Sequence, residues 1–303
     1  MEGSPRQSLS SALWFVLPVA TRFAAMEGDV LTTSQLLPGA DGTLPAGTAA
    51  YETRGTAVTV PEWLVDKCIQ CGTCSLVCPQ ACIRPSYASE EVMKGAPEGY
   101  QTKPATGKEF AGMQYRMQVS PLDCTGCGSC AQVCPGMKGE KALVMKPIDT
   151  QRPGQKVFDY GRTLNEKPEV AAKFKETTVK GSQFKQPMLE FSGACAGCGE
   201  TPYAKLATQL FGDRMFIANA TGCSSIWGGS APATPYTVNK KGHGPAWQNS
   251  LFEDNAEFGF GMALGQKAVR GRLAEYVNEI DETPEDQAMK KDSAQVTNNC
   301  NES

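Results

Sequence analysis

The sequence is poor in histidine, in long apolar runs and in net charge, and each of these absences excludes a common class of protein or site. It has one histidine in 303 residues, His243, which lies between two glycines and is expected to be a loop residue rather than a catalytic group. No apolar run is long enough to cross a bilayer. The net charge is only −3, so no nucleic-acid or other polyanionic partner is indicated. We therefore expect neither a membrane protein nor a nucleic-acid-binding protein.

A secretory signal is also not expected. The apolar segment Ala12–Ala20 near the amino terminus is interrupted by Pro18 and preceded by a single basic residue, Arg6. We expect this segment to be a strand entering a domain. Residues 1–57 are rich in Gly, Thr, Ala and Pro, and they are predicted to form an irregular connecting segment.

Cysteine, by contrast, is abundant, with 13 in the chain. Eight of them fall into two runs with the spacing C-x2-C-x2-C-x3-C-P. The first run holds Cys68, Cys71, Cys74, Cys78 and Pro79, and the second holds Cys124, Cys127, Cys130, Cys134 and Pro135. This is the spacing of bacterial ferredoxins, which bind 4Fe–4S clusters through cysteine thiolates.

In two-cluster ferredoxins the last cysteine of each run binds the other cluster. The predicted ligand sets are therefore Cys68, Cys71, Cys74 with Cys134, and Cys124, Cys127, Cys130 with Cys78. The alternatives are zinc sites and disulfides. Zinc ribbons do not use four cysteines in each run with a proline after each, and a long chain without a secretory pattern disfavours disulfides. Thiolate ligands to iron require a reducing compartment, so we expect the cytoplasm, or an anaerobic organelle in a eukaryote.

The residues around the two runs predict an internal repeat. Strands are expected at Val58–Val60, Ile83–Pro85, Met113–Val119 and Ala142–Met145, with a cluster loop and a short helix inside each half. The fold class is then an α+β ferredoxin-like two-cluster domain over residues 58–146. Residues 86–110 are a polar insertion, and residues 147–186 are a linker with a possible helix around Glu169–Phe174.

A third group of cysteines follows the linker. Cys195 and Cys198 lie in a Gly-rich turn that opens a helix, and apolar residues at helical spacing continue over Tyr203–Phe211. Cys223 comes just after a predicted buried strand, Met215–Asn219. Ligands bind at the carboxyl ends of strands in open α/β sheets, so this unit reads as the start of a cofactor-binding α/β domain.

The stretch from Pro187 to Gly265 closely resembles the pyruvate:ferredoxin (flavodoxin) oxidoreductases, which are large thiamine-diphosphate enzymes. The residues that carry the resemblance are Phe191–Tyr203, Ile217–Gly229 and Asn249–Gly261, with Gly47–Gly55 and Val60–Trp63 upstream. The likeness extends from about Gly28 to about Arg270. It implies that residues 187–303 are an incomplete thiamine-diphosphate-binding α/β domain with a polar tail.

The resemblance also implies a function. The family decarboxylates pyruvate oxidatively with coenzyme A, giving acetyl-coenzyme A, CO2 and reduced ferredoxin or flavodoxin. It implies that Cys195, Cys198 and Cys223 bind a third, proximal 4Fe–4S cluster, and that Glu200 and Cys223 contact thiamine diphosphate. Glu200 could instead be favoured only by the helix dipole of the first turn. The complete protein is then expected to be a homodimer that binds Mg²⁺ with the thiamine diphosphate.

The sequence departs from the family in ways that matter for activity. It has no Gly-Asp-Gly followed by Asn to hold Mg²⁺ and diphosphate, and the only further downstream cysteine, Cys300, lies in a polar tail. We therefore expect the sequence to be a piece of the full enzyme that is inactive alone. The alternative is a stand-alone ferredoxin-type electron carrier with a vestigial tail. Cys82 is expected to be a small buried residue or a free thiol near the first cluster.

Overall fold

The computed structural model describes residues 15–42, 44–164, 173–230 and 233–282 of the chain. These residues form two compact units. The first holds residues up to Phe216 together with Ser225–Ala246, and the second holds Ile217–Ser224 and the residues from Trp247 onward. The predicted domain boundaries at residues 58, 147 and 187 remain predictions.

The amino-terminal segment is helical, which corrects the prediction of a strand and an irregular connection. Its elements are η1 (Val16–Ala20), α2 (Thr21–Ala24), η2 (Gly28–Val30), α3 (Thr33–Leu36), η3 (Leu37–Gly39) and η4 (Thr48–Tyr51). Phe15, Val16 and Val19 are buried, and their spacing is that of one helix face. Pro18 does not break this helical segment, since Phe15 at the N-cap of η1 and Thr21 at its C-cap both have helical backbone angles.

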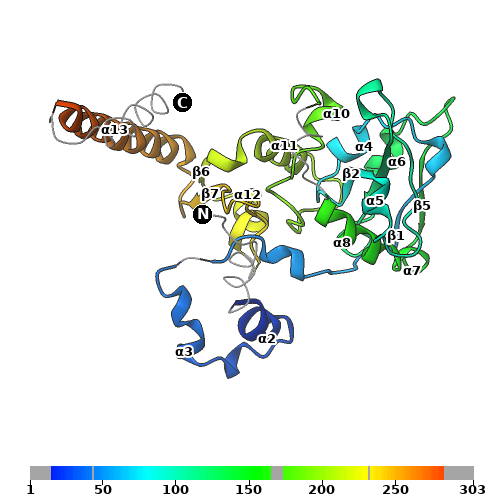
Figure 1. Ribbon diagram of the computed structural model, residues 1–303. Coiled ribbons are helices and arrows are strands. Elements are labelled where there is room, and N and C mark those ends of the chain that lie inside the picture. Colours follow the sequence, from blue (N-terminus) through cyan, green and yellow to red (C-terminus); the bar gives the residue numbers. More distant parts are fainter. Residues whose placement is uncertain (1–14, 43, 165–172, 231–232, 283–303) are drawn as a thin grey trace. The chain divides into compact units, whose positions relative to one another are not determined.

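The centre of the first unit is a module built from two similar halves (Figure 1). The first half is β1 (Thr59–Trp63), α4 (Thr73–Leu76) and β2 (Ile83–Ser89), and the second is β4 (Met113–Val119), α6 (Ser129–Val133) and β5 (Leu143–Pro147). Each strand pairs antiparallel with a strand of the other half, β1 with β5 and β2 with β4. The predicted repeat of strand, cluster loop, short helix and strand is confirmed, and the halves depend on each other for their hydrogen bonds.

The two short helices begin in the same way. Gly72 precedes α4 and Gly128 precedes α6, and both have left-handed backbone angles, with φ of +79° and +77°. Only glycine adopts this conformation at little cost, so each cysteine run can turn sharply between its second and third cysteine. That turn sets the cysteines of each run around a common centre.

The predicted insertion and linker are more structured than expected. The insertion extends β2 to Ser89 and adds α5 (Glu90–Met93), β3 (Lys103–Pro104), which pairs with β4, and η6 (Lys108–Phe110). The linker holds helices of its own: α7 (Ile148–Gln151), α8 (Gly154–Leu164) and α10 (Val179–Ser182). The possible helix at residues 169–174 lies mostly outside the described residues.

An aromatic cluster ties the insertion and the linker to the module. Tyr87 of β2 stacks on Phe110 at 4.9 Å between ring centroids, and on Phe184 at 4.7 Å. Phe174 stacks on both Phe110 and Phe184. Tyr115 of β4 is fully buried beneath them. Buried aromatic rings contribute much of the stability of a core, so residues 174–184 are part of the folded unit.

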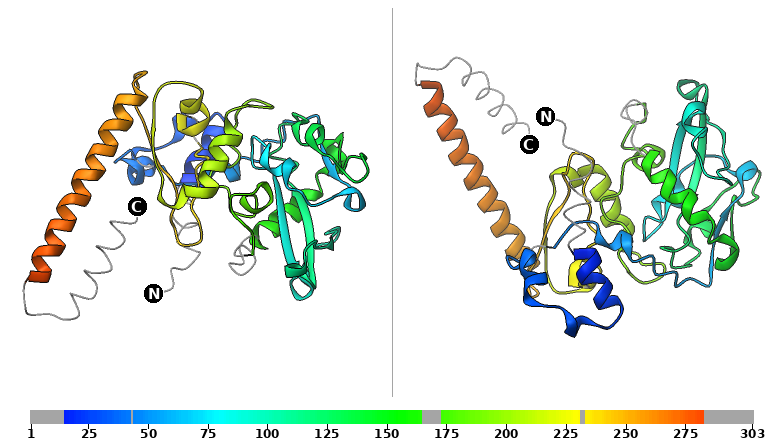
Figure 2. Two further views of the ribbon diagram at one scale, coloured as in Figure 1. Left: turned by 90° about the horizontal axis from the view of Figure 1, so that it is seen from above. Right: turned by 60° about the horizontal axis from the view of Figure 1, so that its bottom comes forward.

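The remaining elements are α11 (Thr201–Phe211), η7 (Gly212–Arg214), β6 (Phe216–Asn219), α12 (Cys223–Ser225), η8 (Ile226–Ser230), β7 (Ala246–Asn249) and α13 (Asn255–Glu282). α13 is one uninterrupted helix (Figure 2). The strand predicted near Met215 exists as β6 and pairs with β7. It is not buried as predicted, because Phe216 is 55% exposed. Only a two-stranded sheet is described there, so the α/β thiamine-diphosphate domain stays a prediction.

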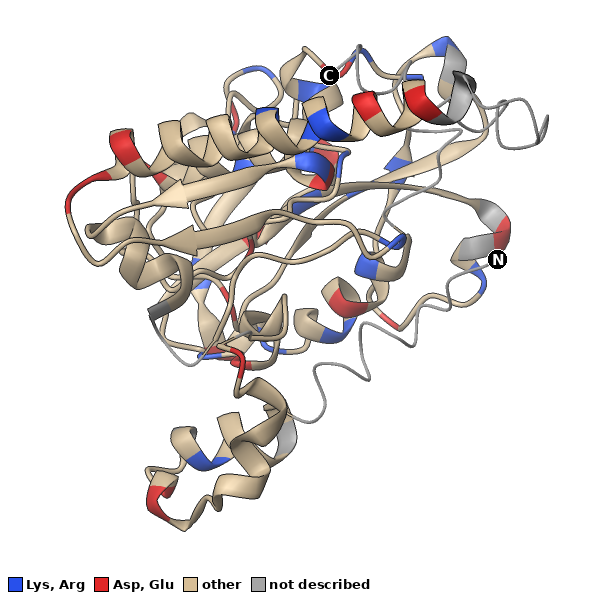
Figure 3. Ribbon diagram, turned by 90° about the vertical axis from the view of Figure 1, so that its left-hand side faces the viewer, with Lys and Arg blue, Asp and Glu red and all other residues tan. Residues whose placement is uncertain are grey.

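No helix in the described residues is both long and apolar enough to cross a membrane. Lysine and arginine are interspersed with aspartate and glutamate along the ribbon (Figure 3). This mixture fits the small net charge of −3.

Candidate iron–sulfur centres

Four thiols drawn from both cysteine runs line one cavity of the module, called here the first cavity. Cys68, Cys71 and Cys74 come from the first run, and Cys134 comes from the end of α6 in the second. Trp63 of β1 closes part of the wall.

The second cavity is its counterpart and is similar in size. Cys124, Cys127 and Cys130 come from the second run, and Cys78 crosses from the first. Cys82 is buried as predicted, but it lines this second cavity rather than lying near the first. The second cavity therefore has a fifth thiol that the first lacks.

The four-thiol linings correspond to the crossed sets expected from the spacing. Within the described residues every cysteine is a free thiol, and no three His, Cys, Asp or Glu side chains meet closely enough to hold a single metal ion. The thiols thus surround a space instead of converging on a point. Four soft thiolates around a cavity fit a 4Fe–4S cluster, and the assignment of each thiol as an iron ligand stays a prediction.

Backbone N–H groups point at the sulfurs of both cavities. The hydrogen bonds run from Gln70 to Cys68 at 3.4 Å, from Gly126 to Cys124 at 3.3 Å, from Cys82 to Cys78 at 3.3 Å and from Ala142 to Cys134 at 3.3 Å. Each half of the repeat contributes the same kind of donor. Hydrogen bonds of this kind stabilise thiolate charge and tune the potential of a bound cluster.

Burial makes three of these thiols hard to ionise without a cation. It raises the pKa of Cys74 well above its ordinary value and that of Cys124 to about 12, and it also raises the pKa of Cys130. Cys78 differs, because a hydrogen bond from the Cys82 thiol, and then the charge of Lys205, lower its pKa to about 5. Cys78 is thus a buried thiol whose negative charge the protein itself stabilises.

The turn that carries Cys195 and Cys198 lies against the second cavity. A Cβ added to Gly197 would come within 3.7 Å of Cys127 Cβ. The turn closes through a hydrogen bond from Cys198 N–H to the Cys195 carbonyl, 3.0 Å long. Burial tends to raise the pKa of Cys198, but hydrogen bonds from the backbone at the start of α11 outweigh it and leave this pKa below its ordinary value.

Gln80 fastens this turn to the module. Its Nε2 donates to the Ala194 carbonyl at 2.8 Å, while its Oε1 accepts from Gly193 N–H at 3.2 Å and from Ser192 Oγ at 3.3 Å. Gln80 follows Cys78 and Pro79, so the end of the first run is joined directly to the start of the third cysteine group. Gln80 is not among the site residues predicted from the sequence.

The two residues expected to contact thiamine diphosphate, Glu200 and Cys223, belong to different units of the structure. Glu200 is exposed just before α11 and accepts a hydrogen bond of 3.4 Å from Trp227 Nε1. Cys223 is an exposed thiol at the start of α12 and belongs to the second unit. Its convergence with Cys195 and Cys198 therefore stays a prediction.

Helix α11 buries its polar face. The burial of this face is not among the features predicted from the sequence. Its buried residues are Thr201, Lys205, Thr208 and Gln209, whereas Tyr203 and Phe211 are 76% and 51% exposed. Lys205 is 1% exposed, and its ammonium donates to backbone carbonyls in and just after α4. These polar residues recur at helical spacing on one face, but the spacing alone does not decide which face of the helix is buried.

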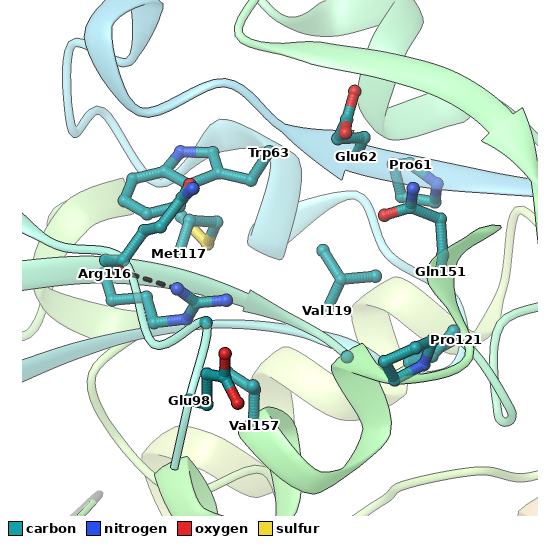
Figure 4. A pocket seen from close by; sticks show the side chains of 14 residues that line it. Pro61, Glu62, Trp63, Glu98, Arg116, Met117, Val119, Pro121, Gln151 and Val157 are labelled. Atoms are coloured by element: carbon teal, nitrogen blue, oxygen red, sulfur yellow. Dashed lines mark hydrogen bonds between the residues drawn. The ribbon is translucent and has the colours of Figure 1, made fainter. Parts of the chain in front are cut away.

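A larger side pocket adjoins the first cavity, since Trp63 and Met117 line both (Figure 4). Arg116 lies over the rings of Trp63 and Tyr100, at 5.6 Å and 4.8 Å, and donates to the Gln101 carbonyl at 2.7 Å. Burial lowers the pKa of Arg116. The sequence analysis did not predict this pocket.

Two family models match the chain. A model described as a 4Fe-4S dicluster domain matches residues 67–137, which hold both cysteine runs. A model described only as a domain of unknown function matches residues 4–57. The first match supports bound iron–sulfur clusters in this module, and the second shows that the amino-terminal segment recurs in other proteins.

Longer proteins match nearly the whole chain. The chain is 57% identical to a pyruvate:ferredoxin oxidoreductase of Moorella thermoacetica over 91% of its own length, and this covers 23% of that protein. It is 56% identical to a pyruvate-flavodoxin oxidoreductase of Enterobacter agglomerans, covering 89% of the chain and 23% of that protein. A pyruvate dehydrogenase [NADP(+)] of Cryptosporidium parvum is 52% identical over 93% of the chain and 14% of its own length. The chain thus spans about a quarter of the length of the two bacterial relatives.

Proposed function

We propose that this chain, which belongs to the pyruvate:ferredoxin (flavodoxin) oxidoreductase family, is the electron-transfer part of such an enzyme. The complete enzyme would decarboxylate pyruvate oxidatively with coenzyme A and pass the electrons to ferredoxin or flavodoxin. The observation that carries the proposal is the pair of matched cavities, each lined by three thiols of one run and the crossing thiol of the other.

A 4Fe–4S cluster bound in each cavity would supply one-electron redox chemistry. The chain's own residues hold the thiols in place and restrict the access of water. Cys68, Cys74, Cys78 and Cys130 are buried, and Trp63 and Leu143 add apolar cover to the first cavity. Exclusion of water raises the effect of nearby charges and N–H groups on a bound cluster.

The finer parts of the proposal concern the third cysteine group. Cys195, Cys198 and Cys223 would bind a proximal cluster, and Glu200 and Cys223 would contact thiamine diphosphate with its Mg²⁺. The approach of Gly197 to Cys127 supports this, because it sets the Cys195–Cys198 turn beside the second cavity. Electrons would then enter the module at the second cavity.

The stand-alone carrier is the less favoured alternative. A carrier needs only the module of residues 58–146, yet the 57% identity extends over 91% of the chain. The buried contacts of Gln80 and Lys205 also tie residues beyond the module to its cysteine runs.

A reconstitution experiment tests the proposal. The chain is purified anaerobically, loaded with iron and sulfide, and assayed for metal content, for ferredoxin and flavodoxin reduction, and for acetyl-coenzyme A formation. We expect two clusters, electron transfer to at least one acceptor after reduction by dithionite, and no acetyl-coenzyme A. Stoichiometric zinc, or two clusters that reduce neither acceptor, would contradict an electron-transfer role. Acetyl-coenzyme A formed by the chain alone would contradict the proposal that the chain is only the electron-transfer part of the enzyme.

A further inference from the structure

A buried lysine lies at the end of the first cysteine run. Lys205 Nζ donates hydrogen bonds to the carbonyl oxygens of Ser75, of Leu76 at 3.1 Å and of Cys78 at 3.2 Å. A protonated lysine has three N–H donors and no acceptor, whereas a neutral amine has only two donors. Three carbonyl partners therefore require the charged ammonium, even though the side chain is only 1% exposed.

The second half of the repeat has its own lysine in the equivalent place. Lys141 Nζ donates to the carbonyls of Ala131 at 2.6 Å and Gln132 at 2.7 Å. These two residues occupy the same positions in the second run, just after its third cysteine, as Ser75 and Leu76 occupy in the first. Lys141, however, is exposed to solvent. The two halves therefore share a lysine contact but differ in its burial.

Burial decides how far each charge acts. Water and salt screen an exposed charge within about 10 Å, whereas a buried charge acts through a medium of low dielectric constant. Lys205 donates to the carbonyl oxygen of Cys78, the residue whose thiol crosses to the second cavity, so its charge lies next to a predicted ligand of the second cluster. The exposed Lys141 has no matching contact with Cys134 among the described hydrogen bonds.

We infer that Lys205 raises the reduction potential of the second cluster above that of the first. The second cluster is the one held by Cys78, Cys124, Cys127 and Cys130. The inference rests on the proposed function, and it makes Lys205 the residue that determines which of the two clusters is reduced first. Reduction adds negative charge to a cluster, and a nearby buried cation stabilises the reduced form. The second cavity is also the one beside the Cys195–Cys198 turn. An electron entering there would be held at the cluster that it reaches first.

The test compares Lys205→Met with Lys141→Met in the reconstituted chain, each titrated potentiometrically with electron paramagnetic resonance detection. For Lys205→Met we expect one cluster to become harder to reduce, with a reduction constant lower by about tenfold, which is about 59 mV for a one-electron couple. Lys141→Met should leave both potentials nearly unchanged, and Lys205→Arg should restore the original potential. Equal shifts in the two methionine variants, or no shift in either, would overturn the inference.

Two single-cluster forms identify which cluster responds. The Cys134→Ser chain should keep only the second cluster, and the shift caused by Lys205→Met should persist in it. The Cys78→Ser chain should keep only the first cluster, and the shift should be absent. If Lys205→Met fails to fold, the Cys134→Ser and Cys78→Ser chains with Lys205 intact still test the inference. The second cluster should have the higher reduction potential of the two. The opposite order would overturn the inference. Iron analysis of the unaltered chain tests the proposed function and not this inference. A chain that fails to bind two clusters would contradict the proposed function.

Discussion

Gln80 Nε2 donates a hydrogen bond of 2.8 Å to the carbonyl oxygen of Ala194, a residue 114 positions further along the chain. Gln80 is 2% exposed, and Ala194 immediately precedes Cys195. One buried side chain therefore joins the end of the first cysteine run to the turn of the third group. Such a link would keep the distance between two cysteine sites constant, on which electron transfer between them would depend.

The first prediction concerns this link. Replacing Gln80 with Ala leaves a buried carbonyl and a backbone N–H without partners, so we expect the free energy of unfolding to fall by about 1–3 kcal/mol. Amide hydrogen exchange at Gly193 should also become faster. The control is Gln132→Ala, because Gln132 is exposed on α6. Equal stability in the two variants would show that Gln80 does not hold the turn.

The second prediction separates a buried ion pair from an exposed one. Glu190 is 3% exposed and pairs with Arg84 and, at 3.1 Å, with Arg162. Burial tends to raise the Glu190 pKa, but the two arginines outweigh it and lower that pKa. Glu190→Ala leaves the buried Arg84 guanidinium without a carboxylate partner and should cost about 3–5 kcal/mol at pH 7.

The matched control is Glu140→Ala. Glu140 pairs with Lys67 at 2.8 Å at the surface, where water screens the interaction, so its removal should change stability little. Anaerobic thermal unfolding of both variants makes the comparison. A large loss for Glu140→Ala together with a small loss for Glu190→Ala would refute the assignment of Glu190 as a structural centre of the first unit.

The third prediction concerns removal of iron. Without a cation, the buried thiols of the two cavities lose the interactions that make them converge, and metal-binding free energy in such sites is folding free energy. Chelation of the reconstituted chain under anaerobic conditions should lower the midpoint of thermal unfolding by about 10 °C or more. Circular dichroism measures the change, and restoring iron and sulfide should reverse it. An unchanged midpoint would mean that the module folds independently of its clusters.

Local patterns predicted the module well. The alternation over Met113–Val119 gives β4 with those same ends, because one side of that strand faces the core. The spacing of the cysteines predicted which thiols share a cavity, since a loop with cysteines three apart curls around one centre. Both features depend on neighbours in the sequence.

Burial that depends on distant partners was not predictable. Val16 and Val19 pack as one helix face, although an apolar run with Pro18 resembles a strand. Lys205 is buried against carbonyl oxygens in and just after α4, some 130 residues earlier in the chain. The propensity of α11 indicates a helix, but only its tertiary contacts decide that the polar face is the buried one.

The most direct test of the account is Cys134→Ser in the reconstituted chain, with Cys82→Ser as the control. Cys134 lies in the second run but lines the cavity of Cys68, Cys71 and Cys74. We predict that Cys134→Ser loses the first cluster and keeps the second, so that iron and sulfide fall from about eight to about four of each per chain. Cys82→Ser should keep both. Loss of the second cluster in Cys134→Ser, identified by loss of the signal that Cys78→Ser also removes, would contradict the crossed arrangement.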